Sequence, residues 1–126
     1  MTDPGYRRDP AYLAARSYIA DCTMALHCNG RRVSPWVPYS DGAVELPWPP
    51  ERKSDIWVNE LRFTDPDTHE VRLIVRIPGV RIRREEPERR RVDVEQHFGS
   101  EIESVMLEYA GRLAEEFPQR ARAGRL

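Results

Sequence analysis

Two strand-like segments, residues 56–63 and 70–77, place the strongest constraint on the fold. Both are rich in β-branched and aromatic residues, which are typical of strands. Asp65-Pro66-Asp67 places turn-forming residues between them. The sequence therefore predicts an antiparallel hairpin over residues 56–77.

Charge complementarity suggests a register for this hairpin. When Leu61 is paired with Val71, two pairs of charged residues face each other across the strands, and in each pair the charges have opposite signs. A shift of one residue loses both pairs. These charge pairs are Glu60 with Arg72 and Arg62 with Glu70. The apolar face predicted by this register consists of Trp57, Leu61, Leu73 and Val75.

A second hairpin is expected from residues 80–83 and 91–94, with Pro78-Gly79 interrupting the preceding strand. Pairing Ile82 with Val92 sets Arg83 against Arg91, a like-charge contact that needs an anion or a splayed end. The arginines of this hairpin could serve either of two functions, contact with nucleic-acid phosphate or contact with protein carboxylates. The candidate anion-binding residues are Arg81, Arg83, Arg84, Arg89, Arg90 and Arg91.

An N-terminal helix is predicted over residues 10–28. Asp9 is a suitable N-cap with Pro10 at the first helical position, and Asn29-Gly30 supplies a left-handed stop. The polar side of this helix would be narrow, which indicates that more than one side is covered. The residues predicted to contact another chain from this helix are Tyr18 and Met24.

A C-terminal helix is predicted from a capping box formed by Ser100 and Glu103. Apolar residues follow at helical spacing until Pro118, where the helix is expected to end. The polar side of this helix is acidic. Residues 119–126 are expected to form a flexible basic tail.

Residues 33–50 contain five of the eleven prolines together with three large aromatic residues. They are compatible with a small edge hairpin around Ser40-Asp41-Gly42 or with an extended loop. Tryptophan and tyrosine are enriched at the centres of protein interfaces. The candidate partner-binding residues of this segment are Trp36, Tyr39 and Trp48.

Together these elements predict an α+β fold. Its four-stranded antiparallel sheet consists of two hairpins, both helices pack on one face, and the Pro/Trp-rich segment lies at the edge. The 126 residues suffice for one domain, which we place at residues 9–118 after a flexible segment, residues 1–8.

Several functional classes find no support in the sequence. No apolar run is long enough to span a bilayer, and no nucleotide-binding or hydrolase motif is present. The three histidines do not have the spacing of a zinc site, so neither a metal nor a cofactor is expected. Cys22 and Cys28 are expected to be reduced thiols in a cytoplasmic protein.

The residues therefore predict a non-enzymatic protein that acts through protein–protein contacts and forms homo-oligomers. Nineteen of the 20 basic residues are arginine, which indicates a high-GC bacterium or its phage. A net charge of −1 does not favour nucleic acid as the partner. The alternatives are a nucleic-acid-binding regulator that uses residues 81–91 and an enzyme without a visible motif.

Overall fold

The computed structural model describes residues 9–46, 48, 54–82 and 91–122 of the chain. The main sheet has the order β2-β1-β5-β6, with β3 pairing the same edge of β1 as β2, and β4 pairs with β7 in a small separate sheet. All pairings are antiparallel. The elements are α1 (Pro10–Asp21), β1 (Thr23–Cys28), β2 (Arg31–Arg32), β3 (Val37–Pro38), the 3-10 helix η2 (Tyr39–Asp41), β4 (Ala43–Glu45), β5 (Ile56–Thr64), β6 (Val71–Ile82), β7 (Arg91–Asp93) and α2 (Val94–Arg122).

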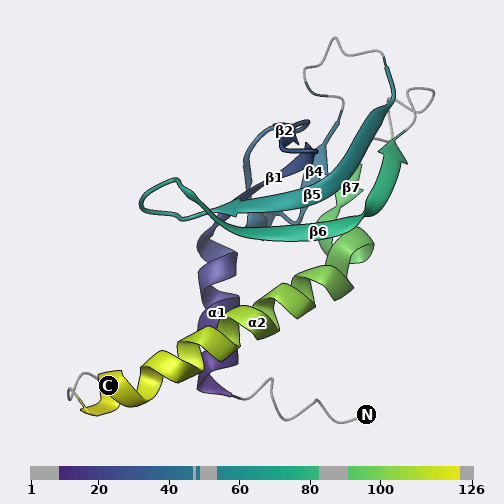
Figure 1. Cartoon of the computed structure of the whole chain (residues 1–126). Coiled ribbons are helices and arrows are strands. Elements are labelled where there is room, and N and C mark those ends of the chain that lie inside the picture. Colours follow the sequence, from purple (N-terminus) through teal and green to yellow (C-terminus); the bar gives the residue numbers. More distant parts are fainter. Residues whose placement is uncertain (1–8, 47, 49–53, 83–90, 123–126) are drawn as a thin grey trace.

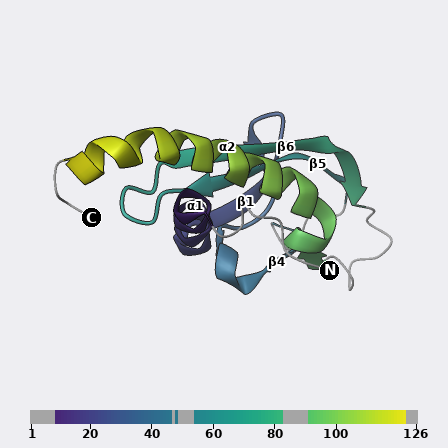
Figure 2. The ribbon, with the colours of Figure 1, turned by 90° about the horizontal axis from the view of Figure 1, so that it is seen from below.

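Both helices lie on the same side of the main sheet, and the C-terminal part of α2 extends beyond α1 (Figures 1 and 2). The core between helices and sheet is apolar. The predicted α+β class, with a helix at each end of the domain, is confirmed. The largest fully buried side chains include Tyr12, Ile19, Met24, Leu26, Ile56, Leu61, Phe63 and Ile102.

The predicted helix over residues 10–28 is correct only in its first half. Asp9 caps α1 as expected, accepting a hydrogen bond at Oδ1 from the Ala11 amide at 2.7 Å. After Asp21, however, the chain forms β1, the strand between β5 and the β2–β3 edge. Met24, Ala25 and Leu26 are completely buried. A strand covered on both faces shows no alternation of apolar and polar residues, so its composition resembles that of a buried helix.

Asn29 and Gly30 form the turn between β1 and β2 instead of ending a helix. Their φ angles are 50° and 83°, and Cys28 pairs with Arg31 across them. Two left-handed central residues define a type I′ hairpin turn, for which Asn-Gly is a preferred sequence.

Gly30→Ala is expected to lower the free energy of unfolding by about 1–2 kcal/mol, because an L-residue is strained at this φ angle. Gly111→Ala is the matched control. Gly111 lies in α2 with open space around its Cβ position, so alanine should raise stability there by about 0.5–1 kcal/mol. Urea denaturation of both variants measures the difference, and equal effects would exclude the strained turn.

Both strands of the first hairpin are confirmed, but the predicted register is wrong. Leu61 pairs with Val75 rather than with Val71, and Glu60 pairs with Arg76. The four-residue difference is even, so Leu61 and Val75 remain in the core. An irregularity between Val58 and Glu60 breaks the alternation of β5, so Trp57 is 52% exposed rather than part of the core.

The predicted second hairpin is not formed. β6 continues through Pro78-Gly79 and pairs Ile82 with Ile56, whereas Val92 pairs with Val44 in the small sheet. Proline is tolerated there because β6 is an edge strand. The segment around Ser40–Gly42 is neither a hairpin nor a plain loop, since β3 pairs with β1 and β4 with β7.

The C-terminal helix begins at Val94, earlier than predicted, and continues past Pro118 to Arg122. Asp93 accepts a hydrogen bond at Oδ1 from the Gln96 amide at 3.0 Å near the start. Buried Phe98 interrupts the helix with non-helical backbone angles, so the predicted capping residue Ser100 lies at the start of the second part.

Candidate functional site

The outward side of β5 and β6, opposite the helices, forms the first candidate surface, which we call the open sheet face. Its side chains come from directly paired positions of the two strands, namely Trp57 with Arg81, Glu60 with Arg76, and Arg62 with Ile74. Arg72 lies on the same side of β6 by alternation. Antiparallel pairing therefore gathers arginines that are far apart in the sequence.

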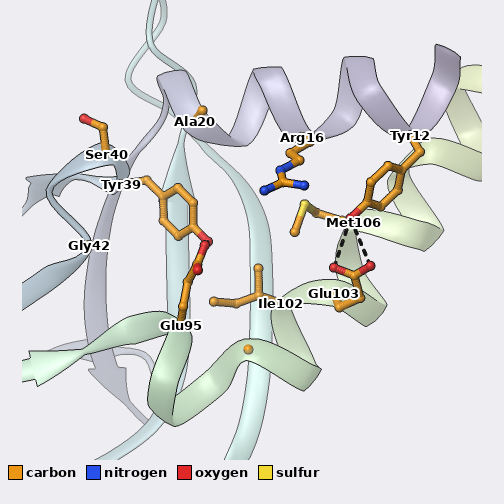
Figure 3. A pocket seen from close by; sticks show the side chains of 11 residues that line it. Tyr12, Arg16, Ala20, Tyr39, Ser40, Gly42, Glu95, Ile102, Glu103 and Met106 are labelled. Atoms are coloured by element: carbon orange, nitrogen blue, oxygen red, sulfur yellow. Dashed lines mark hydrogen bonds between the residues drawn. The ribbon is translucent and has the colours of Figure 1, made fainter. Parts of the chain in front are cut away.

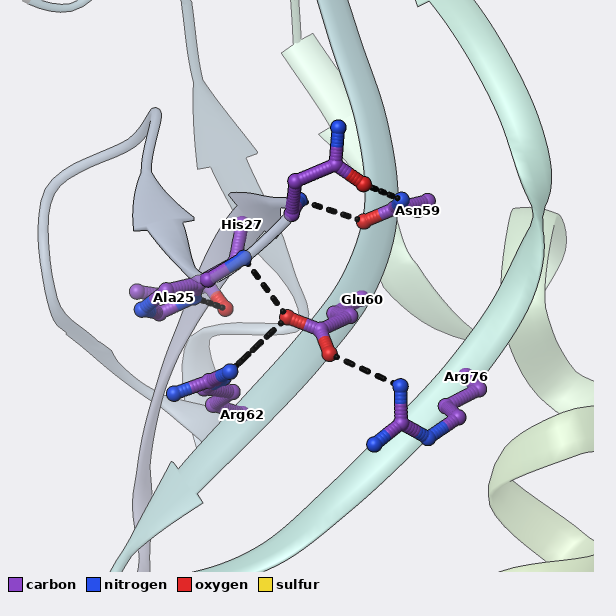
Figure 4. Close-up of polar contacts among 8 residues, drawn as sticks. Ala25, His27, Asn59, Glu60, Arg62 and Arg76 are labelled. Carbon is purple, nitrogen blue, oxygen red and sulfur yellow. Dashed lines mark hydrogen bonds and ion pairs between the residues drawn. The ribbon is translucent and has the colours of Figure 1, made fainter.

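Glu60 organises the centre of the open sheet face. Its side chain is 7% exposed, and its Oε1 accepts hydrogen bonds from Arg62 Nη2 at 3.0 Å and from the Gly30 amide at 3.3 Å. Oε2 accepts from Arg76 Nη1 at 3.2 Å (Figure 4). Arg76 itself is 78% exposed. The carboxylate is thus buried below, and the guanidinium group presents positive charge to the solvent.

The same arrangement occurs at both ends of the face. Arg72 lies 3.7 Å from buried Asp65, and Arg81 lies 3.1 Å from half-buried Asp55. A hydrogen bond from the Tyr18 hydroxyl, followed by the Thr68 and Asp67 amides, lowers the pKa of Asp65 to about 2. Arg72 and Arg81 are therefore each paired with an acid whose side chain is less exposed than that of the arginine, 11% against 57% and 31% against 43%.

Two apolar side chains accompany these arginines. Trp57 is 52% exposed, with the Arg81 guanidinium 6.0 Å from its ring centroid, and Ile74 is 38% exposed. A surface that combines exposed tryptophan, isoleucine and fixed guanidinium groups has the composition of an interface core.

Glu60→Gln is expected to lower the free energy of unfolding by about 1–3 kcal/mol, because two guanidinium groups lose a charged acceptor. Glu70→Gln serves as the control, since Glu70 is exposed and its substitution should change stability by less than about 0.5 kcal/mol. Thermal and urea unfolding measure both variants. An equal, small effect would mean that Glu60 does not fix the two arginines.

A second cluster brings together two of the predicted partner-binding residues. The Arg32 guanidinium lies 4.2 Å from the ring centroid of Trp48 and 6.0 Å from that of Trp36. The ring of Trp36 also contacts that of His27 edge-on at 5.5 Å. Burial lowers the pKa of His27, which lies in β1 and not in the last turn of a helix.

The other predicted partner-binding residues lie elsewhere. Met24 is fully buried in its own core, which leaves no surface for another chain. Tyr18 is half-buried, with its ring 5.3 Å from that of Tyr109 and its hydroxyl donating to Asp65 at 2.6 Å. Tyr39 donates to Glu95 on the helical side of the molecule.

The predicted arginine hairpin does not assemble as expected. Arg81 is in β6, whereas Arg91 is in β7 and lies 3.2 Å from Glu45 of β4. The pairing of Ile82 with Val92, on which the predicted opposition of Arg83 and Arg91 depends, is wrong, because β6 and β7 belong to different sheets. The remaining members of the group lie outside the described residues, namely Arg83, Arg84, Arg89 and Arg90.

The exposed side of α2 forms a surface of opposite charge, which we call the acidic helix face. Glu101, Glu108 and Glu115 recur every seven residues along it, Glu101 half-buried and the other two exposed, and exposed Arg112 lies one turn from Glu108 on the same side. Leu107, which is 39% exposed, lies about 100° around the helix from Glu108. Glu108 and Glu115 point away from the buried Met106 side of the helix. Figure 1 shows α2 on one side of β5 and β6, and the open sheet face is the other side of these strands, so the two faces lie on opposite sides of the sheet.

A cleft of about 560 Å³ lies between α1, η2 and the start of α2 (Figure 3). Tyr12 donates from its hydroxyl to both oxygens of Glu103, at 2.9 and 3.1 Å, and Tyr39 donates to Glu95 Oε1 at 2.9 Å. Arg16 of α1 extends between these two pairs. Burial and the bond to Glu95 raise the pKa of Tyr39, so its hydroxyl remains a donor at neutral pH.

Comparison with protein-family models, with curated proteins and with solved structures finds no match for this chain. Among the residues that the structure describes, no three histidine, cysteine or acidic side chains are grouped as metal ligands would be. None of the helices in the same part of the chain is both long and apolar enough to cross a bilayer. Both cysteines are free thiols, and burial raises the pKa of Cys22 to about 11.

Proposed function

We propose that the protein is a cytoplasmic, non-enzymatic assembly subunit whose open sheet face binds the acidic helix face of a second copy. The observation that carries this proposal is the set of exposed guanidinium groups held over buried or half-buried carboxylates. Because each paired acid is less exposed than its arginine, the more exposed groups of the face are cationic and suit an acidic partner.

The spacing of charges on the two surfaces is compatible. Glu101, Glu108 and Glu115 are separated by about 10 Å per step along a helix that rises 1.5 Å per residue. Arg72 and Arg76 are separated by about 13 Å along a strand. Flexible arginine side chains bridge the difference.

Apolar contacts supply the second component of the proposed interface. Leu107 is exposed on the helix, and Trp57 and Ile74 are exposed on the sheet. Tryptophan and arginine at the centre of a patch commonly dominate the binding energy, and charged pairs around them set orientation. We therefore expect Leu107 of one copy to pack near Trp57 of the next.

The positions of the two faces determine the symmetry of the assembly. A two-fold dimer uses the same patch on both subunits, whereas here α2 and the open sheet face lie on opposite sides of the sheet. Contact between two rigid copies then leaves one face of each unused. The expected product is a ring of three or more subunits or an open filament.

Nucleic acid is the alternative partner, because Trp57 beside Arg81 resembles a base-stacking platform with a neighbouring cation. The net charge of −1 and the acidic α2 disfavour it. The test must therefore include an oligonucleotide.

Sedimentation velocity over a range of protein concentrations tests the proposal. We expect species larger than a dimer at high concentration, and smaller species at high salt, since exposed ion pairs are screened. A monomer at every concentration, or a dimer that grows no further, would contradict it. Binding of a fluorescent single-stranded oligonucleotide at physiological salt, with no self-association, would favour the nucleic-acid alternative.

A further inference from the structure

The cleft between α1, η2 and α2 combines charges of both signs above an apolar floor. Arg16 is exposed and, within the described part of the chain, its guanidinium forms no ion pair. Glu95 is also exposed, and the Tyr39 hydroxyl holds its carboxylate in place. The floor consists of buried Ile102 and Met106.

This arrangement suits a ligand that carries both charges. The planar guanidinium group of Arg16 can bind a carboxylate through two parallel hydrogen bonds. Glu95 has acceptor capacity beyond its bond to Tyr39, and an ammonium group offers three donors. A simple anion would be repelled by Glu95 and Glu103, and a simple cation would be repelled by Arg16.

We propose that this cleft is a binding site for a free L-α-amino acid with an apolar side chain. The ligand carboxylate contacts Arg16, and its ammonium group contacts Glu95. The apolar side chain of the ligand packs on Ile102 and Met106. The Tyr12–Glu103 pair borders this apolar floor at one side. A cleft of about 560 Å³ is within the size range of small-molecule sites. This site is separate from the open sheet face and does not depend on assembly.

The test uses the full chain and the twenty standard L-amino acids, screened by thermal shift and then by isothermal titration calorimetry. The tightest binder is compared with two analogues, one lacking the α-amino group and one lacking the carboxylate. We expect an apolar amino acid to bind best and each analogue to bind about tenfold more weakly or worse, because each loses one charged contact. Leucine, for example, would be compared with 4-methylpentanoate and 3-methylbutylamine.

Arg16→Gln should weaken binding of the intact amino acid about tenfold while leaving the affinity for the amine analogue unchanged or stronger. Glu95→Gln should also weaken binding of the intact amino acid about tenfold, but it should leave the affinity for the carboxylate analogue unchanged or stronger. Both side chains are exposed, so the variants should fold, which circular dichroism checks. Arg112→Gln and Glu70→Gln are matched controls outside the cleft and should leave affinity unchanged.

Three outcomes would overturn the proposal. The first is that none of the twenty amino acids binds. The second is that either analogue binds as tightly as the intact amino acid, which would indicate a simple anion or cation site. The third is that Arg16→Gln and Arg112→Gln have equal effects. The amino-acid titration can also be carried out on a monomeric variant. A failure of amino-acid binding is therefore distinguishable from a failure of the proposed self-assembly.

Discussion

Met24→Glu is expected to unfold the protein. Met24 is completely buried in β1, with Phe63 of β5 opposite on one side and Val37 of β3 on the other. A carboxylate at this position would be buried without a partner, at a cost of several kcal/mol. Because domains of this size are stable by about 5–15 kcal/mol, one such change can abolish folding.

Far-UV circular dichroism and the cooperativity of urea unfolding measure this effect. Leu13→Glu is the matched control, since Leu13 lies in α1 but is 50% exposed, and this variant should fold normally. A folded Met24→Glu protein that dissociates from an oligomer would instead place Met24 at an interface, in conflict with the fold.

Features signalled by local chemistry could be predicted from the sequence. The Asp9 N-cap, the strands around Leu61 and Val75, and the apolar spacing of α2 all appear in the structure. Each depends on residues close together in the chain, for which caps and periodicity are reliable guides. The α+β class follows from these elements alone.

The strand β1 could not be recognised because its neighbours in space are distant in sequence. β5 covers one edge of it, and the short strands β2 and β3 cover the other. Its run from Met24 to Leu26 is apolar at every position, so periodicity favours neither helix nor strand. Asn29-Gly30 was compatible with both, since a left-handed pair ends a helix or forms a hairpin.

The register of β5 and β6 was ambiguous for a physical reason. Arg72 and Arg76 lie four residues apart and therefore on the same side of the strand, so Glu60 meets an arginine in either register. Charge complementarity could not distinguish the two pairings. The irregularity between Val58 and Glu60, which leaves Trp57 on the open sheet face, has no simple sequence signal.

The candidate surfaces were only partly foreseeable. Residue type alone indicates Trp36 and Trp48 as partner-binding candidates, and the structure places both around Arg32. The importance of Glu60 was missed, because a glutamate in an alternating strand is typical of a solvated position. Its burial results from the Gly30 turn and two arginines that only the tertiary fold brings together.

Combining Trp57→Ser with Arg76→Gln is expected to abolish self-association while preserving the fold. Trp57 is 52% exposed and Arg76 is 78% exposed, so neither contributes much to the core. If both are central to the interface, each loss weakens association by about 2 kcal/mol, which together amounts to about a thousandfold. Sedimentation velocity should then show a monomer at concentrations where the wild type is assembled.

The control combines Leu13→Ser with Arg91→Gln, which removes an exposed apolar residue and an arginine away from the open sheet face. This control should assemble like the wild type. Equal dissociation of the two double variants would show that the open sheet face is not the contact surface.

Mixing two complementary variants tests head-to-tail assembly most directly. One variant has a defective open sheet face, Trp57→Ser with Arg76→Gln, and the other has a defective acidic helix face, Glu108→Arg with Glu115→Arg. Each alone should be monomeric, and an equimolar mixture should form only a 1:1 dimer, because one intact pair of faces remains. A mixture that remains monomeric in sedimentation velocity, or variants that assemble on their own, would contradict the account.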